Sequence, residues 1–176
     1  MRISYQNLAL RQATADDAKL LSGWWNSPAV MAFSRYPKGR RTTPERVARQ
    51  IARESGAQHC RLILELDNTP IGEMYFKFRS AQSVEIGIKI ADLSKQNQGY
   101  GKQLVSMLIN YLFEQTKAEK IIATTEIKNL RAQHQLERLG FQHTKTNAND
   151  CKNQLGEVLT YLIYELRENQ FINFAK

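Results

Sequence analysis

The stretch Gln96-Asn97-Gln98-Gly99-Tyr100-Gly101-Lys102 decides how this 176-residue chain is interpreted. It joins a segment of strict apolar alternation, residues 84–90, to a helical apolar pattern over residues 100–115. Glycines let a backbone approach a ligand closely, and the first turn of a helix offers free N–H donors and the positive end of its dipole. This order is typical of a pyrophosphate cradle, to which Lys102 adds charge. The alternative is an ordinary glycine loop that closes onto a helix.

The segments before this loop predict one strand, two helices and three further strands. The helices are expected to begin at the N-cap residues Thr14 and Thr43, the first ending before Pro28 and the second near Gly56. The strands are expected at residues 8–11, 61–66, 71–78 and 84–90.

The segments after the loop predict a helix, a strand, a short helix that ends at Gly140, and two late strands. Three consecutive strands favour an antiparallel meander, and the strand-helix-strand crossover adds a parallel pair. We therefore expect an α+β (mixed α/β) fold with one domain over residues 1–176. Its sheet should be mixed and mostly antiparallel, with about six or seven strands and about four helices on both faces.

The composition limits the partners of the chain. Its net charge of +8 favours anionic partners such as nucleic acid, ribosomes or a phosphate-rich cofactor, although a solvated basic surface would give the same balance. No segment approaches the roughly 20 apolar residues of a membrane-spanning helix, and the N-terminus lacks the apolar run of a secretory signal. We expect a cytoplasmic protein that binds no membrane.

The metal-ligating residue types are scattered. The histidines His59, His134 and His143 form no cluster, and Cys60 and Cys151 lie far apart without a second pair. We therefore expect no metal site and no disulfide.

Two motifs in the correct order carry a resemblance to a known family. Residues 96–101 match the Gln/Arg-x-x-Gly-x-Gly/Ala signature of the GCN5-related N-acetyltransferase (GNAT) superfamily. Downstream, Asn129-Leu-Arg-Ala132 and then Glu137-Arg-Leu-Gly140-Phe141 resemble its N-x-x-S/A and E-x-x-G-F pattern. Leu10-Arg11, residues 24–28 and residues 70–72 also look like the RimJ/RimL-type branch of ribosomal-protein N-terminal acetyltransferases. The resemblance implies a sheet splayed between its fourth and fifth strands, and acetyl-CoA as the cosubstrate.

The resemblance assigns one group of residues to acetyl-CoA. The loop would bind the pyrophosphate, the fourth strand would run along the pantetheine arm, and a fourth-strand N–H would face the thioester carbonyl and stabilise the oxyanion. Asn129 would hydrogen-bond near the thioester. The assigned residues are Ile88, Ile90, Gln96, Asn97, Gln98, Gly99, Tyr100, Gly101, Lys102 and Asn129.

The acceptor side has fewer candidates. Glu85 is the candidate general base, acting on the amine directly or through water, and a solvated or salt-bridged strand residue is the equal alternative. Glu73 is the competing carboxylate. Trp24 is assigned to the acceptor cleft, whereas one tryptophan of the Trp24-Trp25 pair is expected in the core. Leu136 stands where many relatives have a tyrosine acid, so we name no general acid. Residues 153–157 either shape the acceptor entrance or form an ordinary turn.

The function implied by the resemblance is transfer of acetyl from acetyl-CoA to a primary amine by direct attack. The first hypothesis for the acceptor is a protein N-terminal α-amine of the ribosomal-protein type. The alternatives are a small amine, either an aminoglycoside or a polyamine, and a non-catalytic coenzyme A-binding module. We expect no direct nucleic-acid binding, and either a monomer or a homodimer.

Overall fold

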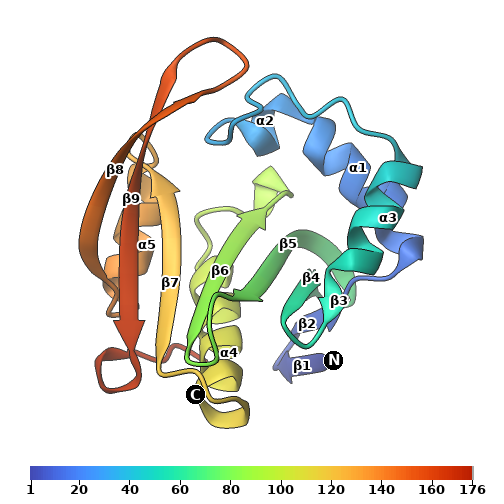
Figure 1. Ribbon diagram of the computed structural model, residues 1–176. Helices are drawn as coiled ribbons and strands as arrows, with labels where there is room; N and C mark the ends of the chain where they lie inside the picture. The colour runs from blue at the N-terminus through green and yellow to red at the C-terminus, as the bar shows by residue number, and fades with distance from the viewer. Residues whose placement is uncertain (176) are drawn as a thin grey trace.

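The computed structural model describes residues 1–175, apart from the side chains of residues 149 and 150. Within this range the chain forms a nine-stranded mixed sheet with helices on both faces, which confirms the predicted fold class (Figure 1). No helix of the described residues is long and apolar enough to cross a membrane.

The N-terminal half forms one arm of the molecule. Its elements are β1 (Arg2–Tyr5), β2 (Leu8–Gln12), the 3-10 turn η1 (Ala15–Asp17), α1 (Ala18–Asn26), α2 (Pro28–Met31), α3 (Pro44–Arg53), β3 (Ser55–Gly56), β4 (His59–Leu66), β5 (Thr69–Phe78) and β6 (Ser83–Ile90). The two predicted helix starts are confirmed. Asp17 accepts the backbone N–H of Thr14 at 2.8 Å, and the Thr43 side chain accepts the N–H of Arg46.

The C-terminal half forms the second arm and the helix behind the sheet. Its elements are η2 (Leu93–Lys95), α4 (Tyr100–Gln115), β7 (Lys120–Glu126), α5 (Leu130–Arg138), β8 (Gln142–Lys152), β9 (Val158–Arg167) and η3 (Glu168–Gln170). The predicted helix over residues 100–115 is confirmed with the same bounds. Three short elements, β1, α2 and β3, were not predicted, because two to four residues carry too little periodicity.

The sheet order is β1-β2-β4-β5-β6-β7-β9-β8, and β3 pairs with β4. Every neighbouring pair is antiparallel except β6 and β7, which are parallel because α4 crosses over between them. Their pairing covers only Ser83↔Lys120 to Ile86↔Ala123. Residues 87–90 and 124–126 therefore diverge, which is the splay that the family resemblance implied (Figure 1).

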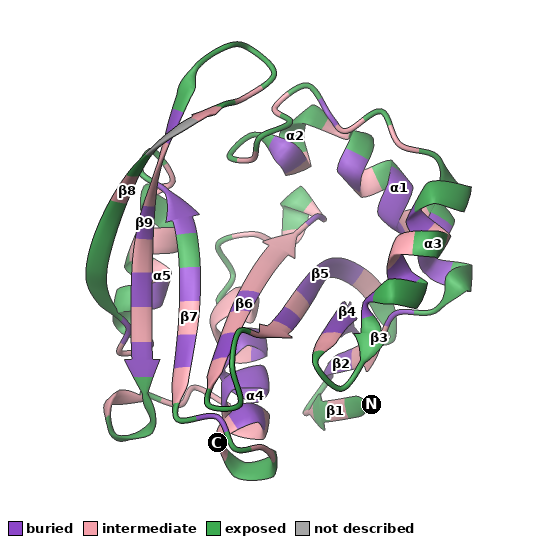
Figure 2. Cartoon of the chain, in the orientation of Figure 1, coloured by how far each residue is buried: buried purple, intermediate pink, exposed green. Residues whose placement is uncertain are grey.

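Two hydrophobic cores lie on opposite faces of the sheet (Figure 2). The larger core packs α4 against the central strands, with Leu104, Leu108 and Leu112 inaccessible to solvent. The smaller core packs α1 and α3 against Ile63 of β4 and includes Trp25. These two cores hold the strands on either side of the splay in place.

Candidate active site

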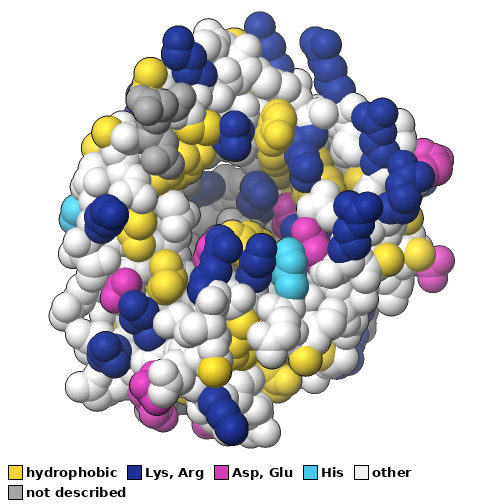
Figure 3. Space-filling view, in the orientation of Figure 1, with side chains coloured by type: hydrophobic (Ala, Val, Ile, Leu, Met, Phe, Trp, Pro, Cys, Tyr) yellow, Lys and Arg dark blue, Asp and Glu magenta, His cyan; other side chains and the backbone are white. Residues whose placement is uncertain are grey.

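The splay opens a passage through the sheet. Figure 3 shows a deep hollow at this place, with Lys and Arg side chains around its rim. Peptide groups along a strand point alternately to its two neighbours. Some backbone groups of residues 87–90 therefore face the passage instead of β7. Ile88 and Ile90 belong to this unpaired segment and are half-buried.

The loop that follows β6 has free backbone donors. Among the described residues, the N–H groups of residues 97–101 donate no hydrogen bond within the chain, and bonding resumes when Lys102 N–H donates to Gly99 at 3.1 Å. Gly99 has φ +87° and Asn97 has φ +61°, left-handed conformations that turn these amides into one concave run before α4. Such a run suits a phosphate group.

The loop is fixed by its neighbours. The Gln96 amide nitrogen donates to the Ile90 carbonyl at 2.8 Å, and its oxygen accepts from Arg131 of α5. A Cβ at residue 101 would stand 3.1 Å from the Gln135 side chain, so Gly101 lets α4 and α5 approach closely. The Lys102 ammonium lies 4.0 Å from the centre of the Phe174 ring.

Asn129 begins α5 at the end of β7. Its side-chain oxygen accepts the N–H of Ala132 at 3.2 Å and caps the helix. Its amide nitrogen has no partner among the described residues. The structure thus brings the two sequence motifs together through the Gln96–Arg131 and Gly101–Gln135 contacts.

On the opposite face of the sheet, a buried ion network forms the floor of the passage. Arg61 of β4 pairs with Glu54 and with Glu73 of β5. Glu73 also accepts the indole N–H of Trp25 at 2.7 Å and lies 3.3 Å from the Lys89 ammonium. Sequence reasoning missed this network, although a charged residue such as Arg61 at the start of an apolar strand was a signal for it.

The network determines the chemistry of Glu73. Burial opposes its ionisation, but the charges of Lys89 and Arg61 prevail and lower its pKa to about 2. A buried carboxylate with this pKa is a poor proton acceptor. Glu73 therefore orients Trp25 and Lys89.

The two tryptophans have different roles. Trp25 is 2% exposed and belongs to the smaller core, whereas Trp24 is half-buried and packs against that core. It is the Trp25 indole that reaches Glu73, and the Arg61 guanidinium lies 4.9 Å from the centre of its ring. No hydrogen bond or ring contact of the described residues links Trp24 to this network.

Glu85 lies on the same face, just before the splay begins. One carboxylate oxygen accepts the Tyr75 hydroxyl at 2.8 Å, and the other pairs with Arg79, with a distance of 2.6 Å to the Arg79 Nε. Burial and Glu85 raise the pKa of Tyr75 above its usual range, so the phenol stays a donor. The structure gives Glu85 partners within the protein and leaves its side chain partly exposed.

Leu136, at the position where many relatives have a tyrosine, is buried in the larger core. It offers no proton.

A bridge closes the passage at its outer end. Gln154, in the turn between β8 and β9, donates its backbone N–H to Arg35 O (3.1 Å) and its side-chain amide to Gly39 O (2.8 Å). Its side-chain oxygen accepts the N–H of Lys38 at 2.9 Å. The turn over residues 153–157 thus joins the second arm to the segment between α2 and α3, as Figure 1 shows at the top of the molecule.

A family model of known proteins matches most of this chain. The family model described as an acetyltransferase (GNAT) domain matches residues 7–142. No curated protein matches the chain in sequence.

Several solved structures share the fold. RimL, a ribosomal alpha-N-protein acetyltransferase solved with coenzyme A, superposes with a TM-score of 0.84 at 15% identity, over 95% of this chain and 98% of its own. Spermidine N-acetyltransferase from Vibrio cholerae gives 0.83 at 17% identity, over 96% and 99%. A GNAT-family acetyltransferase from Bacillus anthracis gives 0.81 at 21% identity, over 96% and 99%. At these identities the likeness establishes the fold.

Proposed function

This chain belongs to the acetyltransferase (GNAT) family and is an acetyl-CoA-dependent N-acetyltransferase, and we propose that its acceptor is the α-amine of a protein N-terminus. The observation that carries the proposal is the bounded acceptor passage. Strands β5 and β6 lie at its base and α1 lies along one side. At its outer end, Gln154 joins the β8–β9 turn to the segment between α2 and α3. Such a passage admits the narrow end of a chain more readily than a branched molecule.

The residues of the loop fit the cosubstrate. Bound acetyl-CoA supplies an activated thioester. The free N–H groups of residues 97–101 and the positive end of α4 would hold its pyrophosphate, and Gln96 would keep the loop in place through Ile90 O. Asn129 would offer its free amide nitrogen to the cofactor. These assignments come from the free donors of this chain and from the motif positions.

The reaction requires a neutral amine and a stabilised oxyanion. Backbone N–H groups of residues 87–90 that face the passage would stabilise the oxyanion, with Ile88 and Ile90 flanking the pantetheine arm. Glu85 would accept the ammonium proton, through water, with its orientation held by Tyr75 and Arg79. A thiolate leaving group of pKa about 8.5 needs no strong acid, which is consistent with Leu136 at the tyrosine position.

Charge favours an α-amine over a polyamine. An α-amine has a pKa near 8 and is deprotonated more easily than an amine near 10.4. Two carboxylates that face the passage, Glu73 and Glu85, are already paired with cations. These two are therefore not free to bind a polyamine, although a structural neighbour acts on spermidine.

The test is an acceptor screen that follows release of the coenzyme A thiol. Peptides with a free N-terminus are expected to give turnover, whereas the same peptides with a formylated N-terminus are not. Spermidine and an aminoglycoside serve as the competing acceptors. A higher kcat/KM for either of them than for every free peptide would overturn the proposed acceptor and leave the family assignment intact.

A further inference from the structure

The segment between α2 and α3 is strongly cationic. Residues 35–41, which we call the cationic loop, contain Arg35, Lys38, Arg40 and Arg41 and no carboxylate. The sequence has no acidic residue between Asp17 and Glu45. None of the four cations forms an ion pair with a described residue. Gln154 holds this loop over the acceptor passage.

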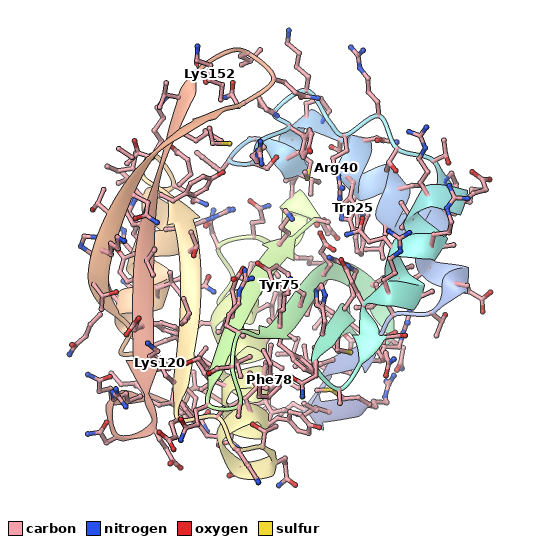
Figure 4. All side chains as sticks on the ribbon, in the orientation of Figure 1. Trp25, Arg40, Tyr75, Phe78, Lys120 and Lys152 are labelled. Atoms are coloured by element: carbon pink, nitrogen blue, oxygen red, sulfur yellow. The ribbon has the colours of Figure 1, made fainter. Side chains whose placement is uncertain are left out.

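Arg40 is the cation of this loop that faces the floor of the passage. Its guanidinium lies 4.6 Å from the centre of the Trp25 ring and 5.5 Å from that of Tyr36, and its backbone N–H donates to Trp25 O at 2.8 Å. Figure 4 shows Arg40 directly above Trp25, with Tyr75 on the strands below. Ring faces attract a guanidinium without neutralising it, so its N–H donors remain available to an anion.

The ion network beneath Arg40 is balanced, so the charge of Arg40 itself is in excess. Glu54 and Glu73 are the two carboxylates of the floor network, and Arg61 and Lys89 balance them one for one. Burial lowers the pKa of His59, which keeps this neighbour of Glu54 neutral at pH 7. Arg40 then adds one charge that forms no ion pair with a carboxylate of the described residues.

We propose that Arg40 is a specificity-determining residue that binds an anionic group of the acceptor. The preferred acceptor then carries a carboxylate or a phosphate near its amine, and in a protein this means acidic residues directly after the N-terminal one. The proposal rests on the acetyltransferase function of the same site. A guanidinium presents paired donors to a carboxylate or phosphate, which a neutral or cationic acceptor would leave unused.

The experiment compares acceptors that differ only in charge. One series is the peptides Ser-Glu-Glu, Ser-Gln-Gln and Ser-Lys-Lys with a common neutral tail, and the other is phosphoethanolamine, ethanolamine and putrescine. kcat/KM is measured for the wild type, Arg40→Gln, Arg40→Lys and Arg138→Gln. Arg138 is exposed on α5 and serves as the control for loss of one positive charge.

We expect the wild type to favour the anionic member of a series over the neutral one by about tenfold to a hundredfold, the effect of one charge-assisted hydrogen bond. Arg40→Gln should abolish this preference, Arg40→Lys should restore part of it, and Arg138→Gln should keep it. Turnover of phosphoethanolamine but of no peptide would remove the N-terminal acceptor and support the anion site. Equal losses across a series in Arg40→Gln, a preference for the neutral or cationic member, or no turnover in either series would overturn the inference.

Discussion

Tyr75 of β5 lies opposite Gly87 of β6, and its ring occupies the space that a side chain at residue 87 would need. A Cβ built on Gly87 would stand 2.3 Å from the Tyr75 Cε1 atom. Gly87 is also the first residue of β6 beyond its pairing with β7. The glycine thus lets an aromatic ring lie across the floor of the passage where the splay begins.

Replacing Gly87 with alanine should displace this ring. We expect Gly87→Ala to break the hydrogen bond between Tyr75 and Glu85, to lower kcat/KM at least about tenfold, and to cost about 1–3 kcal/mol of stability as overpacking does. Calorimetry should show unchanged acetyl-CoA affinity. Gly23→Ala is the matched control, because Gly23 is exposed in α1 with open space around it and alanine favours helix. Wild-type activity in Gly87→Ala would show that the ring can move without consequence.

Gly99 tests the cofactor loop. Gly99→Glu places bulk and negative charge beside the free N–H groups of residues 97–101, and should remove the rise in melting temperature that acetyl-CoA gives to the wild type. Gly156→Glu controls for both backbone strain and charge, since Gly156 has φ +80° and open space but lies in the turn between β8 and β9. Equal acetyl-CoA affinity in the two variants would contradict the assignment.

A substitution of Leu136 distinguishes a packing role from a catalytic role at the position where many relatives have a tyrosine. Because its side chain is buried in the larger core, Leu136→Ala should lower the free energy of unfolding by about 2–5 kcal/mol in a urea titration. His134→Ala, at an exposed position of the same helix, should change it little. The prediction is wrong if the two variants unfold at the same urea concentration.

Glu73 should make the protein sensitive to acid. Its pKa is lowered from 4.5 to about 2, because the charges of Lys89 and Arg61 outweigh the opposing effect of burial. The stability from this ionised group is complete above the unfolded pKa and is lost as the pH falls from about 4.5 towards 2, about 3 kcal/mol in all.

Glu73→Gln should remove this part of the pH dependence and destabilise the protein at pH 7 by about 3–5 kcal/mol, because Arg61 and Lys89 lose their shared partner. Unfolding free energies at several pH values between 7 and 3 provide the measurement. Glu114→Gln, exposed on α4, is the control. Parallel curves for the wild type and Glu73→Gln would show that the ion network does not stabilise the fold.

Local patterns were enough to predict most of the fold. The alternation around Ile86 gave β6, and the apolar stripe through Leu104 and Leu108 gave α4, because burial on one face has a fixed period in each element. The glycine loop before α4 could also be predicted, because its glycines and the start of the helix are adjacent in the sequence.

The side-chain contacts on the acceptor side of the site could not be predicted from local patterns. Arg61, Glu73 and Lys89 meet only through the register of β4, β5 and β6. Turn geometry and an irregularity between Leu64 and Glu65 set that register, and the apolar alternation of a single strand does not show it. The bridge from Gln154 to Gly39 joins segments more than a hundred residues apart. Contacts of this kind form only when the whole sheet is assembled. The sequence therefore indicated candidate residues on the acceptor side but not the residues they contact.

Glu85 is the residue on which the proposed mechanism depends. It lies one residue before the last β6–β7 pair, on the face that carries Tyr75 and the acceptor floor. Glu85→Gln keeps the shape and an acceptor for the Tyr75 hydroxyl but removes the base. It should lower kcat/KM by about 10²–10⁴ near pH 7, with acetyl-CoA affinity unchanged because the loop over residues 96–102 is untouched. The loss should shrink as the pH approaches the pKa of the amine, where the free amine forms unaided.

Two further variants separate proton transfer from positioning. Arg79→Gln removes the ion pair and leaves the carboxylate, and Tyr75→Phe removes only the hydroxyl. If Glu85 is the base, both should retain more activity than Glu85→Gln, and neither should reproduce its recovery at high pH. The measurement is a pH–rate profile of all four proteins with the amine that the acceptor screen identifies. Equal activity of Glu85→Gln and the wild type near pH 7 would remove Glu85 from the mechanism. Since Glu73 is already fully paired, the amine would then lose its proton to water alone.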